Sequence, residues 1–88
     1  MKISGRQVAA ARDLLGISQG ELALAVGVAL TTVARFEVGD TTPHASTLAK
    51  IVNELQRRGI EFTNGDGIGV RLSFAKAEAA ARLGAAGR

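Results

Sequence analysis

The stretch SQGELALAVGVALTTVARFE, residues 18–37, decides the fold, because it reads as two short helices separated by a single glycine. Gly27 supplies the backbone freedom that a sharp turn between two packed helices requires. Apolar residues at helical spacing form an inward stripe on both sides of the break: Leu22, Ala23, Val26, Val33 and Phe36. The sequence therefore predicts a pair of helices packed against each other across a tight turn.

The second helix of the pair, expected over residues 29–38, presents a set of four side chains on its outward face. Leu30, Thr31, Ala34 and Arg35 point outward together at helical spacing. Such a face is the means by which a recognition helix presents side chains to the DNA major groove. We therefore expect function to depend on this face.

These residues resemble the lambda-repressor-like helix-turn-helix regulators, also called the xenobiotic-response-element type. The resemblance covers residues 5–58 and rests on LGISQGELALAVGV (15–28), TTVARFEVGDTTP (31–43) and the amphipathic STLAKIVNEL (46–55). It implies a mainly α, four- to five-helix DNA-binding domain. It also implies that Gln19 opens the second helix and contacts phosphate, and that Gly39 ends the recognition helix. The positions that it implies reach base edges are Leu30, Thr31 and Arg35.

Three residues depart from the family pattern. Ala29 stands where a serine or threonine usually caps the recognition helix, and it has no oxygen to accept the free N–H groups, a loss of about 0.5–2 kcal/mol. Leu30 offers only apolar contact, for instance to a thymine methyl. Asp40 lies where relatives often carry a basic residue, and its carboxylate would be repelled by the DNA backbone.

The remaining candidate DNA contacts are polar residues near the recognition helix. Thr32 is expected to contact phosphate or water, and Arg6, Thr41 and Thr42 match positions that flank the duplex in relatives. Each has the alternative of being a solvated surface residue. Arg35 has a more specific alternative, which is an ion pair with Glu21, Glu37 or another local carboxylate.

Local signals place the flanking helices. Ser4 is expected to cap a first helix over residues 5–15, and Ser18 with Glu21 has the spacing of a capping box. A further helix is expected over residues 46–58, ended by Gly59.

The chain changes character after residue 58. Residues 60–63 and 69–74 alternate apolar and polar side chains around the turn residues 64–67, which predicts a β-hairpin. An isolated hairpin is marginally stable, so it must pack on the helices, pair with a second copy or contact another protein. Residues 75–88 are alanine-rich, and we expect a helix through Leu83 that frays beyond it. The predicted organisation is a DNA-binding domain over 1–58, a hairpin and dimerisation element over 59–74, and a tail over 75–88.

Composition is consistent with a small binding module in the cytoplasm. The chain has 88 residues, a formal net charge of +3 and no cysteine, which excludes disulfides and thiolate metal sites. The one histidine, His44, cannot build a histidine-rich metal site, and no cofactor or membrane partner is expected. The sequence contains no nucleophile motif and no paired acid and base, so we expect no enzyme activity.

Two functions from different classes follow from these observations. The first is a sequence-specific regulator that binds double-stranded DNA as a homodimer, as a repressor or autoregulator. The second is a protein-interaction module, or an antitoxin-like regulator, that binds a protein partner through its C-terminal segment.

Overall fold

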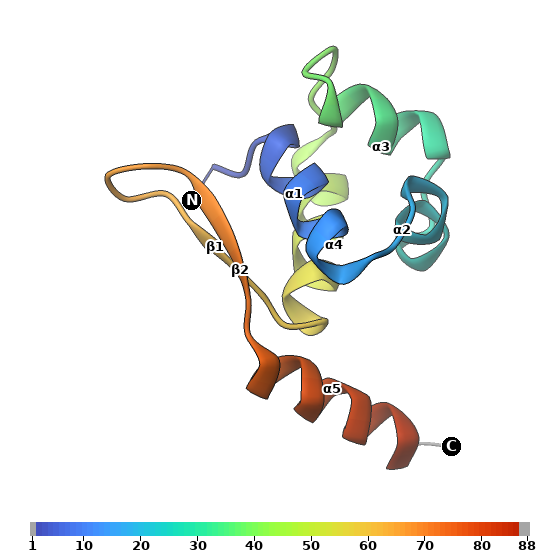
Figure 1. Ribbon diagram of the computed structural model, residues 1–88. Coiled ribbons are helices and arrows are strands. Elements are labelled where there is room, and N and C mark those ends of the chain that lie inside the picture. Colours follow the sequence, from blue (N-terminus) through green and yellow to red (C-terminus); the bar gives the residue numbers. More distant parts are fainter. Residues whose placement is uncertain (1, 87–88) are drawn as a thin grey trace.

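The computed structural model describes residues 2–86, with residues 83–86 described by their helical backbone alone. These residues form five helices and one two-stranded sheet (Figure 1). Their bounds are α1 (Gly5–Leu15), α2 (Gln19–Val26), α3 (Leu30–Glu37), α4 (Ala45–Arg57), β1 (Ile60–Thr63), β2 (Gly69–Leu72) and α5 (Phe74–Ala86). The expected mainly α domain of four to five helices with a C-terminal hairpin is confirmed. None of the helices described is long and apolar enough to cross a membrane.

Local capping interactions set where the first helices begin. The Ser4 hydroxyl accepts the Gln7 N–H at 3.2 Å, and the Ser18 hydroxyl accepts the Glu21 N–H at 3.0 Å. In both cases the third helical residue bonds back to the N-cap N–H, so each helix start is a full capping box. Gly27 has φ +73 and ends α2, as the turn required. The predicted caps at Ser4 and Ser18 are confirmed.

The core joins the first four helices to the hairpin. Its largest fully buried side chains are Val8, Leu22, Val33, Ile51, Leu55 and Ile60. Of the stripe expected from residues 18–37, Leu22, Ala23, Val33 and Phe36 are buried, and Val26 packs against them from the edge. In α1, Val8 and Ala11 are fully buried at helical spacing, whereas Leu14, the next apolar residue at that spacing, has 48% of its surface exposed. In the last turn of α1, Leu15 rather than Leu14 packs against the core.

The start of α1 lies directly on the last turn of α3. A Cβ placed on Gly5 would lie 1.8 Å from the Phe36 carbonyl oxygen, which is far inside any allowed contact. Glycine is therefore needed here for close approach of two backbones. This contact sets the position of α3 relative to α1.

The hairpin pairs within one chain and is attached to α1. β1 and β2 are antiparallel, with Ile60 opposite Leu72 and Thr63 opposite Gly69. The buried Gln7 amide lies within 3.2 Å of the Thr63 carbonyl and 3.1 Å of the Gly69 carbonyl, and donates to this end of the hairpin. Since Ile60 is 1% exposed and belongs to the core, the hairpin is packed on the helices rather than suspended beside them.

In the C-terminal segment, two predicted element boundaries differ from those of the structure. Phe74 was expected to end the second strand, but β2 stops at Leu72 and Phe74 begins α5. The Ser73 hydroxyl accepts the Lys76 N–H at 3.2 Å, a local cap that favours helix at this point. α5 then runs to Ala86, three residues past the predicted end, and projects from the body in Figure 1. The predicted fraying at Gly84–Ala86 is therefore wrong for these residues, and Gly87 lies outside the described residues.

Candidate nucleic-acid interface

The face of α3 that points away from the core is the one expected from the sequence. Val33, Phe36 and Glu37 are buried, whereas Leu30, Thr31 and Arg35 are exposed. The helix spans Leu30–Glu37, and the end residues of the expected 29–38 segment are its caps. As expected, Ala29 makes no side-chain cap. The exposed face therefore begins at Leu30, the first residue of the helix.

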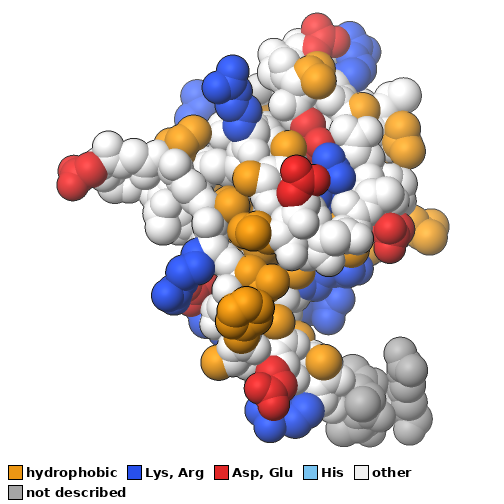
Figure 2. Space-filling view, viewed as in Figure 1, with side chains coloured by type: hydrophobic (Ala, Val, Ile, Leu, Met, Phe, Trp, Pro, Cys, Tyr) orange, Lys and Arg blue, Asp and Glu red, His pale blue; other side chains and the backbone are white. Residues whose placement is uncertain are grey.

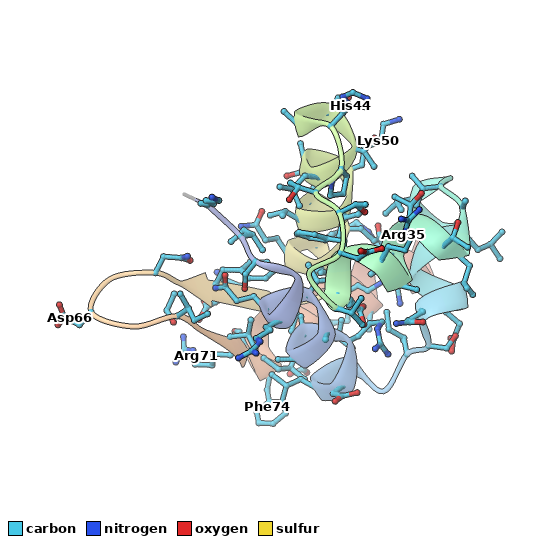
Figure 3. All side chains as sticks on the ribbon, turned by 90° about the horizontal axis from the view of Figure 1, so that it is seen from above. Arg35, His44, Lys50, Asp66, Arg71 and Phe74 are labelled. Carbon is cyan, nitrogen blue, oxygen red and sulfur yellow. The ribbon has the colours of Figure 1, made fainter. Side chains whose placement is uncertain are left out.

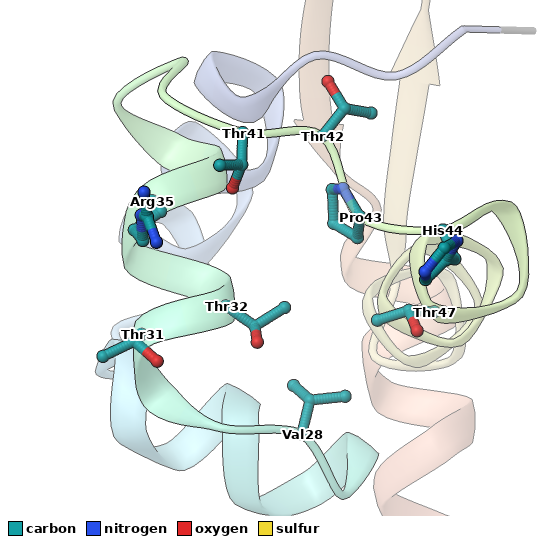
Figure 4. Close-up of a pocket in the computed structure, with 9 residues that line it drawn as sticks. All are labelled: Val28, Thr31, Thr32, Arg35, Thr41, Thr42, Pro43, His44 and Thr47. Carbon is teal, nitrogen blue, oxygen red and sulfur yellow. The ribbon is translucent and has the colours of Figure 1, made fainter.

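An open groove of about 350 Å³ runs beside this face and gathers most of the candidate residues (Figure 4). Its wall on α3 carries Thr31, Thr32 and Arg35, and the loop between α3 and α4 brings Thr41 and Thr42 alongside. All five side chains carry hydrogen-bond donors. One surface thus presents a guanidinium and a row of hydroxyls.

The groove also contains residues that were not predicted. The remaining lining residues are Val28, Pro43, His44 and Thr47, from the turn before α3, the loop after it and the first turn of α4. The segment from Thr41 to Thr47 is rich in polar residues, and this feature of the sequence could have pointed to His44 and Thr47. The start of α4 comes opposite α3, however, only once α4 packs against α2, α1 and β1 in the folded chain.

Gln19 lies outside this groove, in a buried polar network. Its amide donates to Glu37 at 3.0 Å, and Arg12 donates to both carboxylate oxygens of Glu37 at 2.7 and 2.8 Å. Burial raises the pKa of Glu37, but the hydrogen bonds from Arg12 and Gln19 and the charge of Arg12 outweigh burial and hold this pKa below its ordinary value. The network joins α1, α2 and α3 through Glu37, and so sets the angle at which α3 is presented.

Arg6 and Leu30 also lie apart from the groove. Arg6 is exposed on α1 and lines a separate hollow with Val38 and Gly39, just past the end of α3. Leu30 lies beside the start of α2, with its Cδ1 3.4 Å from the place of a Cβ on Gly20. The structure therefore brings five of the eight candidates, Thr31, Thr32, Arg35, Thr41 and Thr42, into one groove and leaves Gln19, Leu30 and Arg6 around it.

The charged partner of Arg35 is neither of the two named carboxylates. Glu21 serves the capping box of α2, and Glu37 is held by Arg12. Arg35 instead donates from Nε to Asp40 at 2.8 Å, and both side chains are exposed. The expected alternative of a local ion pair at Arg35 is confirmed, with Asp40 as the carboxylate.

The side chains of the groove suit the binding of a polyanion. Hydroxyl and guanidinium donors on an open surface match phosphate oxygens and base edges. Within residues 2–86, no three side chains of His, Cys, Asp or Glu lie together in a way that could hold a metal ion.

Comparison with protein families gives a match over much of the chain. A helix-turn-helix family model matches residues 8–62, which span α1 to β1 and include α3 and the groove. No curated protein matches the chain closely enough to count as a relative. Domains of this family bind DNA in transcription regulation and are not ordinarily catalytic. The chain belongs to the lambda-repressor-like helix-turn-helix family of DNA-binding transcription regulators.

Proposed function

We propose that this regulator is sequence-specific and acts as a dimeric repressor or autoregulator that reads the major groove with α3 and its caps, residues 29–38. The main support for this proposal is the groove beside α3. There the donors of Thr31, Thr32 and Arg35 share one open surface with the loop hydroxyls of Thr41 and Thr42. Phosphate contacts set the register of a protein on the duplex and base contacts set sequence choice, and this surface offers donors for both.

The exposure of each residue supports a division of roles. Thr31 and Arg35, on the exposed side of α3, would reach base edges, and Leu30 would contact a thymine methyl. Thr32 and the loop threonines would donate to phosphate. The amide of Gln19 gives one N–H to Glu37, which leaves its second N–H for a phosphate.

The C-terminal segment supports the dimer. Phe74 is 81% exposed at the start of α5, and Ile68 is exposed in the hairpin turn. Figure 2 shows hydrophobic side chains gathered in a patch that runs from the body toward α5. Burying such a patch against a second copy would stabilise the pair. A two-fold dimer would then place two α3 helices in major grooves about 34–36 Å apart.

The same exposed Phe74 favours a second candidate function, in which the C-terminal segment binds a protein partner, as an antitoxin-like regulator would. Sedimentation velocity separates the two. A dimer that dissociates in Phe74→Ser, with unchanged helix content by circular dichroism, supports self-association. A wild-type monomer at micromolar concentration would contradict it and favour the partner.

DNA binding is tested by fluorescence anisotropy on labelled duplex from upstream of the gene, against a scrambled duplex, at two salt concentrations. We expect clear preference for the native duplex and weaker binding at the higher salt concentration, because released counterions drive the phosphate contacts. Equal affinity for both duplexes would contradict sequence-specific autoregulation. A reporter gene behind the same upstream segment tests repression, since its output should rise when the protein is removed.

Two variants test the groove. Arg35→Ala and Thr31→Ala should each cost about 1–3 kcal/mol on the native duplex and relax preference at one base pair. Arg82→Ala is the matched control for Arg35→Ala, since Arg82 is similarly exposed and lies on α5, far from α3 in Figure 1. If Arg82→Ala weakened binding as much as Arg35→Ala, the loss would be one of overall charge, and the groove would not be the reading surface.

A further inference from the structure

Asp40 is held against Arg35 by the backbone as well as by charge. Gly39 has φ +79, and the chain turns back there over the last turn of α3. The Asp40 N–H donates to the Arg35 carbonyl at 2.9 Å, and its carboxylate accepts from Arg35 Nε at 2.8 Å. Most exposed ion pairs contribute little because two long side chains must be ordered. Here the turn already places the short Asp40 side chain, so only Arg35 has to be ordered.

The ion pair occupies one particular atom of the guanidinium. Among the hydrogen bonds of residues 2–86, the side chain of Arg35 makes only the one from Nε. Its terminal nitrogens, Nη1 and Nη2, remain open on a side chain that is 60% exposed and lines the groove with Thr31 and Thr32. Two N–H groups on the terminal nitrogens are the donors that can bind O6 and N7 of guanine together.

The Asp40 carboxylate also repels the phosphates of a bound duplex. Asp40 is 55% exposed, and it stands in the loop that leads to Thr41 and Thr42 at the groove. A negative charge at this place weakens binding to any duplex, whatever its sequence. The residue thus lowers general affinity while it orients a side chain that can read a base.

We propose that Asp40 is a positioning residue that sets specificity: it holds Arg35 by Nε so that Nη1 and Nη2 read a guanine, and its charge disfavours DNA that lacks that guanine. The inference rests on the proposed function, because it names what Arg35 reads and how Arg35 is held. It also gives a reason for an acidic residue beside a DNA-binding groove.

The test is selection from a library of duplexes with a randomised core, followed by sequencing, for the wild type, Arg35→Ala, Asp40→Asn and the double variant. The wild type should select a motif with a guanine that Arg35→Ala no longer selects. Asp40→Asn should keep the rest of the motif but lose roughly tenfold in preference for that guanine. Its affinity for a scrambled duplex should rise about threefold, the size of one screened charge contact.

Asp66→Asn is the matched control. It removes the same charge from the tip of the hairpin, well away from Arg35 in Figure 3. It should change neither the guanine preference nor the affinity for the scrambled duplex. Thermal unfolding by circular dichroism checks that each variant is folded at the selection temperature.

Several outcomes would overturn the inference. Unchanged guanine preference in Asp40→Asn would mean that Asp40 does not orient Arg35, and a sharper preference would mean that it competes with guanine for Arg35. If Asp40→Asn altered preference at that position in the Arg35→Ala background, the effect would not pass through Arg35. A wild-type protein that selects no motif would instead overturn the proposed function itself. That result can be told apart from the results above, in which the wild type does select a motif.

Discussion

Removing the Glu37 carboxylate should destabilise the fold far more than removing an exposed carboxylate. In Glu37→Leu, the side chain of Arg12 loses two hydrogen bonds of 2.7 and 2.8 Å, and the amide of Gln19 loses one of 3.0 Å. The Arg12 side chain is only 15% exposed, so most of its charge is left without compensation by water. Breaking a buried pair costs about 3–5 kcal/mol.

The lower end of that range applies here. Arg12 keeps a hydrogen bond to the Ile17 carbonyl at 3.0 Å, and its small exposed fraction gives water partial access. We therefore expect Glu37→Leu to lower the free energy of unfolding by about 3 kcal/mol at neutral pH. Domains of this kind have total stabilities of about 5–15 kcal/mol, so the loss would be a large part of the whole. Arg12→Met combined with Glu37→Leu should cost less than Glu37→Leu alone, because no unpaired charge remains.

Urea denaturation followed by circular dichroism measures these differences. The urea midpoint should fall in Glu37→Leu with little change in the m-value, since the surface exposed on unfolding is similar. Glu78→Leu is the matched control, because Glu78 and Arg82 form an exposed pair 3.9 Å apart on α5. That control should change stability by less than about 1 kcal/mol. A Glu37→Leu variant no less stable than Glu78→Leu would refute the reasoning.

Lowering the pH gives a second test of the stabilisation by Glu37, and the direction of the expected change follows from the pKa shift. The pKa of Glu37 is lower in the folded protein than its ordinary value, so the stabilisation that Glu37 provides is complete above the ordinary pKa, about 4.3. It is lost as pH falls through the lower pKa of the folded state. The stability difference between wild type and Glu37→Leu should therefore narrow as pH is lowered below about 4. A difference that is constant down to pH 2 would contradict the assignment.

Two further substitutions follow from the backbone geometry. Gly5→Ala should lower the melting temperature markedly, by about 4–8 °C for each kcal/mol lost, because its Cβ would meet the Phe36 carbonyl oxygen at 1.8 Å. Gly20→Ala is the control and should not destabilise the protein, because its Cβ has ordinary contacts from 3.4 Å. Equal melting temperatures of the two variants would rule out the close approach at Gly5. Ala29→Ser should raise stability by about 0.5–1 kcal/mol in urea denaturation, because Ala29 has the extended backbone of an N-cap without a capping oxygen, and no gain would mean that the start of α3 is already satisfied.

The parts of the fold that could be predicted from sequence depend on neighbours a few residues apart. The N-cap at Ser4, the capping box at Ser18 and the end of α2 at Gly27 are local hydrogen-bonding or backbone features, and all three are present. The hairpin over residues 60–63 and 69–72 follows equally from alternation and a polar turn. Two local boundaries failed, both in the C-terminal segment. At Phe74 the alternating pattern continued but the Ser73 cap favoured helix, and α5 continues past the expected end at Leu83 to Ala86.

The candidate site was predicted in part for the same reason. Helical periodicity alone placed Thr31 and Arg35 on the exposed side of α3. It could not place Thr47, which reaches the groove only because α4 packs back against the body. Nor could it choose among the carboxylates near Arg35, because the choice of Asp40 depends on the turn at Gly39 and on Arg12 having taken Glu37.

By itself, the sequence determined the helices, their caps, the hairpin and the family, since these depend on side-chain periodicity and on hydrogen bonds between near neighbours. Tertiary structure alone decided the partner of Glu37, which is Arg12, twenty-five positions away, and the attachment of the hairpin to Gln7 on α1. It also decided that α3, the turn before it, the loop after it and the first turn of α4 share one groove. Contacts of this kind arise when packing of apolar faces brings distant segments together, and neither spacing nor composition encodes which polar groups then meet.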